Sequence, residues 1–222
     1  MIMKRTFITL VLVISALTAY AQPHIGDWAK FGRYEEANRT VTVRPKAVFM
    51  GDSITDWWFD KDPDFFTENN FIGRGISGQA TAHMLVRFRR DVIDHHPKYV
   101  VILAGTNDVA KNLGVISHEN TLGNIISMCE LARANKIKPI ICSVLPCNYF
   151  FWRPEEKGQE KEIIKLNELL KEYAKSAKIP YVDYHTAMKD ENDGLPKKYA
   201  DDGCHPNRNG YELMEKIILE YL

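Results

Sequence analysis

Two stretches far apart in the sequence carry the residue types of a nucleophile and a general base. In Gly51-Asp52-Ser53 a serine directly follows an apolar run, and Asp202 stands three residues before His205. A serine hydroxyl attacks well only when a base takes its proton, and a carboxylate can hold the imidazole of that base in the required tautomer. Taken alone, Ser53 is explained equally well as a helix cap, and a histidine next to a proline is more often an ordinary surface residue. The spacing nevertheless allows nucleophilic catalysis by Ser53, with His205 as base and Asp202 as its partner.

Two further stretches could supply hydrogen-bond donors to a developing negative charge. Gly78 lies in a glycine-rich turn, where a backbone N–H can approach a ligand closely. Asn107, in Gly105-Thr106-Asn107-Asp108, offers a side-chain amide donor. A plain turn at Gly78 and an Asx turn at Asn107 are the simpler readings when each stretch is taken alone. The glycines have neither a phosphate-loop lysine nor the dinucleotide-binding spacing, so a nucleotide site is not indicated.

The elements that would hold these four stretches alternate along the chain. Apolar runs of strand length cover residues 47–50, 71–73, 99–103, 139–145 and 180–184, and helical spacing covers residues 81–92, 122–134, 160–177 and 210–222. Strands that are apolar on both faces and alternate with helices predict an α/β fold with an open parallel sheet flanked by helices. The ligand site of such a sheet lies beyond the carboxyl ends of its strands, where the first three stretches fall. Residues 22–44 form a less regular lead-in, with a helix expected around 28–38.

In order and spacing, the four stretches resemble the four sequence blocks of the SGNH/GDSL hydrolase family. These blocks are Gly51-Asp52-Ser53, Gly78, Gly105-x-Asn107-Asp108 and Asp202-x-x-His205, and the resemblance runs from about residue 46 to residue 222. The chain is most similar to secreted bacterial acylhydrolases related to platelet-activating-factor acetylhydrolase-like and carbohydrate esterases.

The resemblance implies a three-layer, flavodoxin-like fold with about five parallel strands. It implies Ser53 as nucleophile, His205 as base and Asp202 as the acid, and an oxyanion hole made of the Ser53 N–H, the Gly78 N–H and the Asn107 side chain. The chemistry is hydrolysis of an ester through an acyl-enzyme intermediate, and it calls for no metal and no organic cofactor. We expect a small acyl group, most simply acetyl, on a small-molecule or carbohydrate substrate. A lysophospholipase or thioesterase with a longer acyl slot is the alternative, followed by a non-catalytic binding module.

Further residues near the four stretches are candidates for contacts with the substrate. Asp52 precedes the serine, whereas Trp152 and Arg153 follow the fourth predicted strand and so fall on the site side of the sheet. Trp57 and Trp58, just after the serine, could form the floor of an acyl or sugar pocket, and core packing explains them at least as well.

Composition and the first residues bear on compartment and partners. The chain has 222 residues, 45% of them hydrophobic, with 29 basic and 29 acidic side chains, as in an ordinary globular protein without the basic excess of nucleic-acid binders.

Residues 1–21 have a short basic start, an apolar run too short to span a bilayer, and Ala19-Tyr20-Ala21 before Gln22. They predict a signal peptide, an exported protein without a membrane span in its mature part, and one domain over residues 22–222. Oligomeric state is left open.

Export makes a disulfide chemically reasonable. The four cysteines do not have metal-ligand spacing, so a zinc site is not indicated. Cys147 and Cys204 fall in loops after the fourth and fifth predicted strands, and a disulfide between them is the one pairing that the predicted topology suggests.

Overall fold

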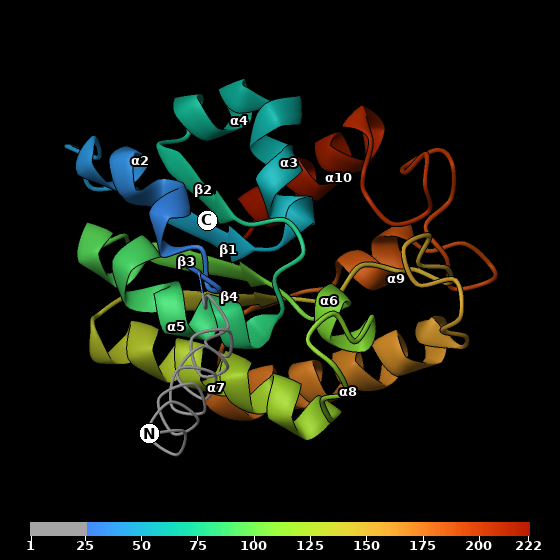
Figure 1. Cartoon of the computed structure of the whole chain (residues 1–222). Helices are drawn as coiled ribbons and strands as arrows, with labels where there is room; N and C mark the ends of the chain where they lie inside the picture. Colours follow the sequence, from blue (N-terminus) through green and yellow to red (C-terminus); the bar gives the residue numbers. More distant parts are fainter. Residues whose placement is uncertain (1–25) are drawn as a thin grey trace, which may run out of the picture. The chain divides into compact units, whose positions relative to one another are not determined.

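Five short parallel strands form the centre of the fold, in the order β2-β1-β3-β4-β5. They are β1 (Ala47–Gly51), β2 (Phe71–Gly75), β3 (Tyr99–Leu103), β4 (Lys138–Cys142) and β5 (Tyr181–Val182). The computed structural model describes residues 26–222, so the predicted signal peptide lies outside the described residues. Within residues 33–222, which form one compact unit, the α/β fold with a parallel sheet flanked by helices is confirmed (Figure 1).

Helices cover both faces of the sheet because successive strand residues point to opposite sides. Val48 and Met50 of β1 pack into one apolar cluster, while Ala47 and Phe49 pack into the other. The first cluster is closed by α5 (Thr81–Asp91), α7 (His118–Ala134) and α8 (Gln159–Ala177). The second is closed by α3 (Ser53–Lys61), α4 (Pro63–Glu68), α9 (Tyr184–Met188) and α10 (Arg208–Leu219). Continuous apolar runs are therefore required in the central strands.

Short helices complete the described chain. They are the 3₁₀ helices Phe31–Tyr34 and Ile93–His95, α2 (Glu35–Arg39) and α6 (Thr106–Val109). Residues 26–32 form a separate short unit, in which the carboxylate of Asp27 accepts the N–H groups of Phe31 and Gly32. No helix in residues 26–222 has the length and apolarity needed to cross a membrane.

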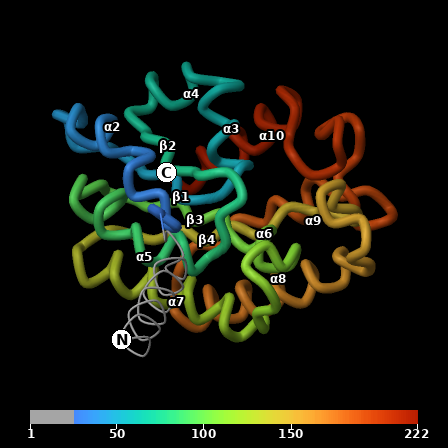
Figure 2. Tube along the Cα trace, in the orientation of Figure 1, coloured from blue at the N-terminus to red at the C-terminus, as the bar shows by residue number. Residues whose placement is uncertain are grey.

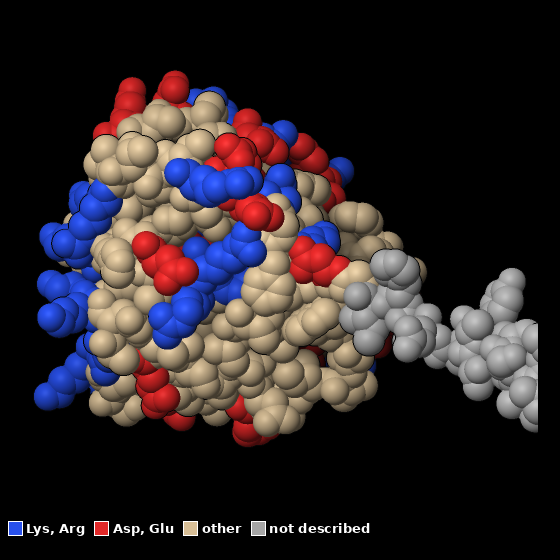
Figure 3. Space-filling model, turned by 60° about the vertical axis from the view of Figure 1, so that its left-hand side comes forward, with Lys and Arg blue, Asp and Glu red and all other residues tan. Residues whose placement is uncertain are grey.

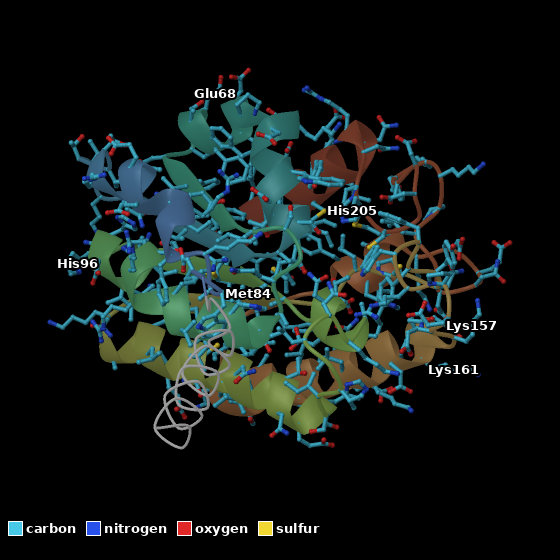
Figure 4. All side chains as sticks on the ribbon, in the orientation of Figure 1. Glu68, Met84, His96, Lys157, Lys161 and His205 are labelled. Carbon is cyan, nitrogen blue, oxygen red and sulfur yellow. The ribbon has the colours of Figure 1, made fainter. Side chains whose placement is uncertain are left out.

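Segments from distant parts of the chain meet at the carboxyl ends of the strands. In Figure 2, α3, α6 and the segment leading into α10 lie at one end of the sheet, although their colours run from cyan through green to red. Figure 4 shows His205 at this end and His96, which precedes β3, at the opposite end. The predicted strand-to-helix junctions are thus placed on one edge.

The opposite, amino-terminal edge is rich in cations. Arg133, Lys136, Lys138 and Lys178 surround a hollow of about 360 Å³ there, and Figure 3 shows Lys and Arg side chains gathered on this side of the molecule. Helices α7 and α8 end at this edge, and Arg133 donates to the terminal carbonyl of α8 at Ala177 over 2.6 Å. Cations stabilise helix C-termini, so the charge of this edge follows from the orientation of the helices.

A fully buried arginine ties the nucleophile strand to the following loop. Arg87 of α5 is inaccessible to solvent, and its guanidinium bonds to the Asp91 carboxylate (2.9 Å), the Gln79 side chain (2.6 Å) and the Gly51 carbonyl (3.2 Å). A buried charge is tolerated only when it is paired and hydrogen-bonded, as Arg87 is. The network therefore fixes the end of β1 relative to residues that follow β2.

Arg87→Met is expected to lower the free energy of unfolding by about 3–5 kcal/mol, because it leaves the Asp91 carboxylate buried without its counter-charge. Urea denaturation of the variant and the wild type measures this difference. The double variant Arg87→Met/Asp91→Leu should be more stable than the single variant, since neither charge then remains buried alone. A single variant within 1 kcal/mol of wild type would contradict this role of the ion pair.

Candidate active site

Ser53 is the first residue of α3, and only Asp52 separates it from the end of β1. The helix is capped by Asp52, whose carboxylate accepts the Ile54 N–H at 3.0 Å, so the Ser53 hydroxyl is not used as the cap. A Cβ added at Gly51 would lie 2.1 Å from Thr55 Oγ1 and 2.8 Å from the Leu103 carbonyl oxygen. Only glycine fits here, which explains how the chain turns sharply from strand to helix and presents Ser53 at the sheet edge.

The Ser53 hydroxyl meets the imidazole of His205 across 152 positions of sequence. Ser53 Oγ lies 2.9 Å from Nε2 of His205, and Nδ1 of the same ring lies 2.7 Å from Oδ2 of Asp202. The other carboxylate oxygen of Asp202 accepts the backbone N–H groups of Cys204 (2.9 Å) and His205 (2.7 Å). The structure thus brings the three predicted residues into one hydrogen-bonded chain, which can move a proton from a hydroxyl to an imidazole.

Hydrogen bonding keeps Asp202 ionised. Burial acts to raise the pKa of its carboxyl group, but the hydrogen bonds from the backbone of His205 and Cys204 and from the imidazole outweigh burial and hold the pKa below its ordinary value. A carboxylate in this position accepts the Nδ1–H of His205 and leaves Nε2 free to accept a proton.

Aromatic rings surround the imidazole. The Trp57 ring lies over it with a centroid distance of 4.3 Å, and the rings of Trp152 and Phe151 lie at 5.8 and 6.1 Å. Trp58, by contrast, is buried between Phe65 and Tyr211. Of the two consecutive tryptophans, Trp57 therefore belongs to the site and Trp58 to the core.

The two further predicted donors stand side by side near the serine's strand. Gly78 has φ of +81°, a conformation that glycine adopts without strain. Next to it, the carbonyl of Gln79 accepts a hydrogen bond of 3.0 Å from Nδ2 of Asn107. An amide nitrogen has two hydrogens, so this bond leaves Asn107 one more to donate.

The junction that carries Asn107 is anchored by Asp108, whose role is not evident from its place in the sequence. Its buried carboxylate accepts the backbone N–H (2.9 Å) and the hydroxyl (2.6 Å) of Thr81, the first residue of α5. Ala80, which precedes that helix, has no side-chain acceptor, so Asp108 supplies the missing cap from another loop. A helix start without its own capping residue is the sequence signal that could have pointed to such a partner.

The three residues expected to contact the substrate lie in three different surroundings. Asp52 is 1% exposed and its carboxylate accepts the Ile54 N–H, so this carboxylate does not face the surface where a substrate would bind. Trp152 places its ring near His205, but its indole N–H donates to Asn112 at 3.1 Å. Arg153 contacts the Lys111 carbonyl at 3.4 Å and the Glu155 carboxylate at 3.5 Å. These two side chains hold the surrounding loops together.

All four cysteines are buried free thiols; the neighbouring Cys147, together with burial, raises the pKa of the Cys204 thiol, while the Cys147 thiol itself donates to the Tyr149 carbonyl at 3.2 Å. The predicted partners are therefore neighbours, but the structure does not contain the predicted disulfide. In residues 26–222 no group of three or more His, Cys, Asp or Glu side chains is arranged to hold a metal ion.

Burial gives Asp52 an unusual titration. Burial raises the pKa of this carboxyl group to about 7. The hydrogen bond from the Ile54 N–H acts to lower the pKa, and the negative charge of Asp108 acts to raise it further. Since an unfolded aspartate has a pKa of about 3.9, the folded protein binds a proton between pH 4 and 7 that the unfolded chain has released. Stability contributed by this group therefore falls as the pH rises through that window.

We expect Asp52→Asn to reduce the loss of stability between pH 5 and pH 8, because an amide oxygen can accept the Ile54 N–H without ionising. The measurement is urea denaturation at pH 5, 6, 7 and 8, where each pKa unit corresponds to about 1.4 kcal/mol. Asp201→Asn, at an exposed position, is the matched control and should keep the wild-type dependence. Equal pH profiles for wild type and Asp52→Asn would show that Asp52 does not titrate in this range.

Comparison with known proteins agrees with this geometry. The model of the GDSL-like Lipase/Acylhydrolase family matches residues 49–213. A solved GDSL-like lipase from Bacteroides thetaiotaomicron is 48% identical, with a TM-score of 0.84 over 87% of this chain and 97% of that one. The platelet-activating factor acetylhydrolase IB subunit alpha1 of Rattus norvegicus is 28% identical over 46% of this chain and 44% of its own length. An acetylxylan esterase from Geobacillus stearothermophilus is 22% identical over 67% of this chain and 69% of its own length.

The chain spans less than half the length of several curated relatives that it matches. The family match, however, covers most of this sequence, from the middle of β1 to α10. Apart from the first two residues of β1, the parallel sheet and the strand-to-helix junctions found above lie within the same span. The chain belongs to the GDSL-like lipase/acylhydrolase family.

Proposed function

We propose that this protein cleaves a small acyl ester, most simply acetyl, through an acyl-enzyme on Ser53. The observation that carries the proposal is the hydrogen-bonded chain from Ser53 Oγ through His205 to Asp202, with distances of 2.9 and 2.7 Å. His205 Nε2 takes the hydroxyl proton while Oγ attacks the acyl carbonyl carbon, and the imidazolium then gives that proton to the departing alcohol. Water, deprotonated by the same nitrogen, releases the acid and restores the serine.

The negative charge that develops on the carbonyl oxygen requires fixed donors. We assign this role to the backbone N–H groups of Ser53 and Gly78 and to the remaining N–H of the Asn107 amide. Ser53 begins α3, and the first N–H groups of a helix have no partner within the helix, which favours an anion there. None of these donors has to move as the charge forms, which is the condition for strong stabilisation of the transition state.

The aromatic rings beside the imidazole support a small acyl group on a polar alcohol such as a sugar. Trp57 and Phe151 are 37% and 50% exposed beside the imidazole, and flat rings of this kind suit the apolar face of a sugar. The acetyl substrates named for two of the relatives agree with this choice.

A longer acyl chain is the second candidate, because the aromatic side chains of Tyr149 and Phe151 are exposed, and Phe151 lies beside His205.

We also propose that residues 1–21 direct export, with cleavage before Gln22, because they have the basic, apolar and small-residue zones of a signal peptide.

Hydrolysis of p-nitrophenyl esters of increasing acyl length tests the proposal. We expect kcat/KM to be highest for acetate and to fall with chain length, and Ser53→Ala to abolish both turnover and labelling by a serine-directed phosphonate. A maximum at eight or more carbons would favour the longer slot. Turnover or labelling that survives in Ser53→Ala would refute Ser53 as nucleophile.

Asp202→Asn should lower kcat by about 10⁴, the loss known for the same change in another triad. Because Oδ1 is held by two backbone N–H groups, the new amide would present its N–H₂ to Nδ1 of His205 and force the proton onto Nε2, toward the serine. Steady-state kinetics on p-nitrophenyl acetate measures the loss, and circular dichroism checks that the fold is unchanged. A kcat within tenfold of wild type would show that another group orients the histidine.

A further inference from the structure

The side chain of Asn107 is held by a second asparagine that belongs to none of the four sequence blocks. Asn112 Nδ2 donates to Asn107 Oδ1 at 2.5 Å, and the backbone N–H of Asn112 donates to the Asn107 carbonyl at 3.0 Å. Between them Lys111 adopts φ of +56°, which turns the chain back on itself. Asn112 is thus attached to Asn107 through both its side chain and its backbone.

The next group in this chain is the indole of Trp152. Its Nε1–H donates to Asn112 Oδ1 at 3.1 Å, so a continuous series runs from Trp152 through Asn112 and Asn107 to the carbonyl of Gln79. The segment around Asn112 is attached to the Trp152 loop by two further contacts, from Lys111 to Glu156 and from Arg153 to the Lys111 carbonyl. Asn107 is 3% exposed, so water does not compete freely for its amide.

The direction of the series is set by its two ends. An indole N–H can only donate and a carbonyl oxygen can only accept, whereas each amide between them could in principle present either its oxygen or its nitrogen. Because Trp152 donates, Asn112 must present its oxygen to Trp152 and its nitrogen to Asn107. Asn107 must then present its oxygen to Asn112, which leaves its nitrogen for Gln79 and for the site.

From this geometry we infer that Asn112 is a positioning residue for ester hydrolysis, oriented in turn by Trp152. It fixes which end of the Asn107 amide faces the reacting carbonyl oxygen. A flipped Asn107 would present an oxygen to the oxyanion and repel it. The inference rests on the proposed function, since it concerns the donor that stabilises the negative charge.

The test is the steady-state kinetics of Asn112→Asp on p-nitrophenyl acetate, alone and combined with Asn107→Ala. A carboxylate keeps the size of the side chain and still accepts from Trp152, but it cannot donate to Asn107 Oδ1. We expect kcat to fall by ten- to a hundredfold with KM within twofold of wild type, because the donor acts mainly once charge develops. Asn107→Ala should lower kcat by about 10²–10³. Asn112→Asp should add no further loss in that background, since the two residues act through one group.

Two further measurements separate positioning from a general structural role. Lowering the pH from 8 to 5 should shrink the deficit of Asn112→Asp relative to wild type, because a protonated carboxyl group can donate again. Trp152→Phe keeps a ring beside His205 but removes the indole N–H, and it should lower kcat by a smaller factor. Asn135→Asp is the matched control: Asn135 donates to the Leu131 carbonyl at the end of α7, and its replacement should leave kcat unchanged.

Wild-type kcat in Asn112→Asp, or losses that simply add in the double variant, would overturn the inference. If Ser53→Ala is inactive in the same assay, such an outcome for Asn112→Asp removes only the role of Asn112 and leaves the proposed ester hydrolysis in place. Activity that survives in Ser53→Ala would instead refute the proposed function itself.

Discussion

The contact of 2.9 Å between Ser53 and His205 constrains nearly every element of the fold. It joins the start of α3, just after the first strand, to the loop before the last helix, so the elements between them must return the chain to one edge of the sheet. A parallel sheet meets this constraint because each helical crossover returns the chain to the amino edge and each strand ends at the carboxyl edge. The sheet edge therefore gathers polar groups that the sequence keeps far apart.

The polar groups that define this edge are buried, and each is satisfied from a different loop. Arg87 contacts the end of β1 and the Gln79 side chain, Asp108 caps α5, and Asn107 bonds to the Gln79 carbonyl. An unsatisfied buried donor or acceptor costs about 1–3 kcal/mol, so these contacts hold the loops in one arrangement. Rigid donors are what a developing oxyanion needs, and the rigidity here comes from hydrogen bonds between the loops.

Much of this arrangement is readable in the sequence, because apolar runs and helical spacing report burial directly. The alternation predicted the parallel sheet, and the helices expected at 81–92 and 160–177 are found at Thr81–Asp91 and Gln159–Ala177. The fifth strand ends earlier than predicted, because Asp183 caps α9 and ends the pairing. Helices α4 and α9 have six and five residues, too few for a clear period.

The site could be predicted only in part. Ser53, Asp202 and His205 stand in distinctive local spacings, and the structure brings them together. Asn112 acts through contacts with another loop, and nothing in its own neighbourhood distinguishes it from a turn residue. Asp108 stands in one of the four blocks, but the helix that it caps lies elsewhere in the sequence. Asp52, Trp152 and Arg153 were expected at the substrate because of their neighbours in sequence, and this stays a prediction; the structure adds that their hydrogen bonds are made within the protein. Partners of this kind become visible only in three dimensions.

The position of His205 in the chain also affects when the protein can become active during its own synthesis. The ribosome makes a chain from its amino end, so all five strands, which end at Val182, are complete before Asp202 and His205 are added. A growing chain can thus contain the sheet and Ser53 while it still lacks His205, the proposed base. The Ser53 hydroxyl gains its imidazole partner only after all five strands have been made.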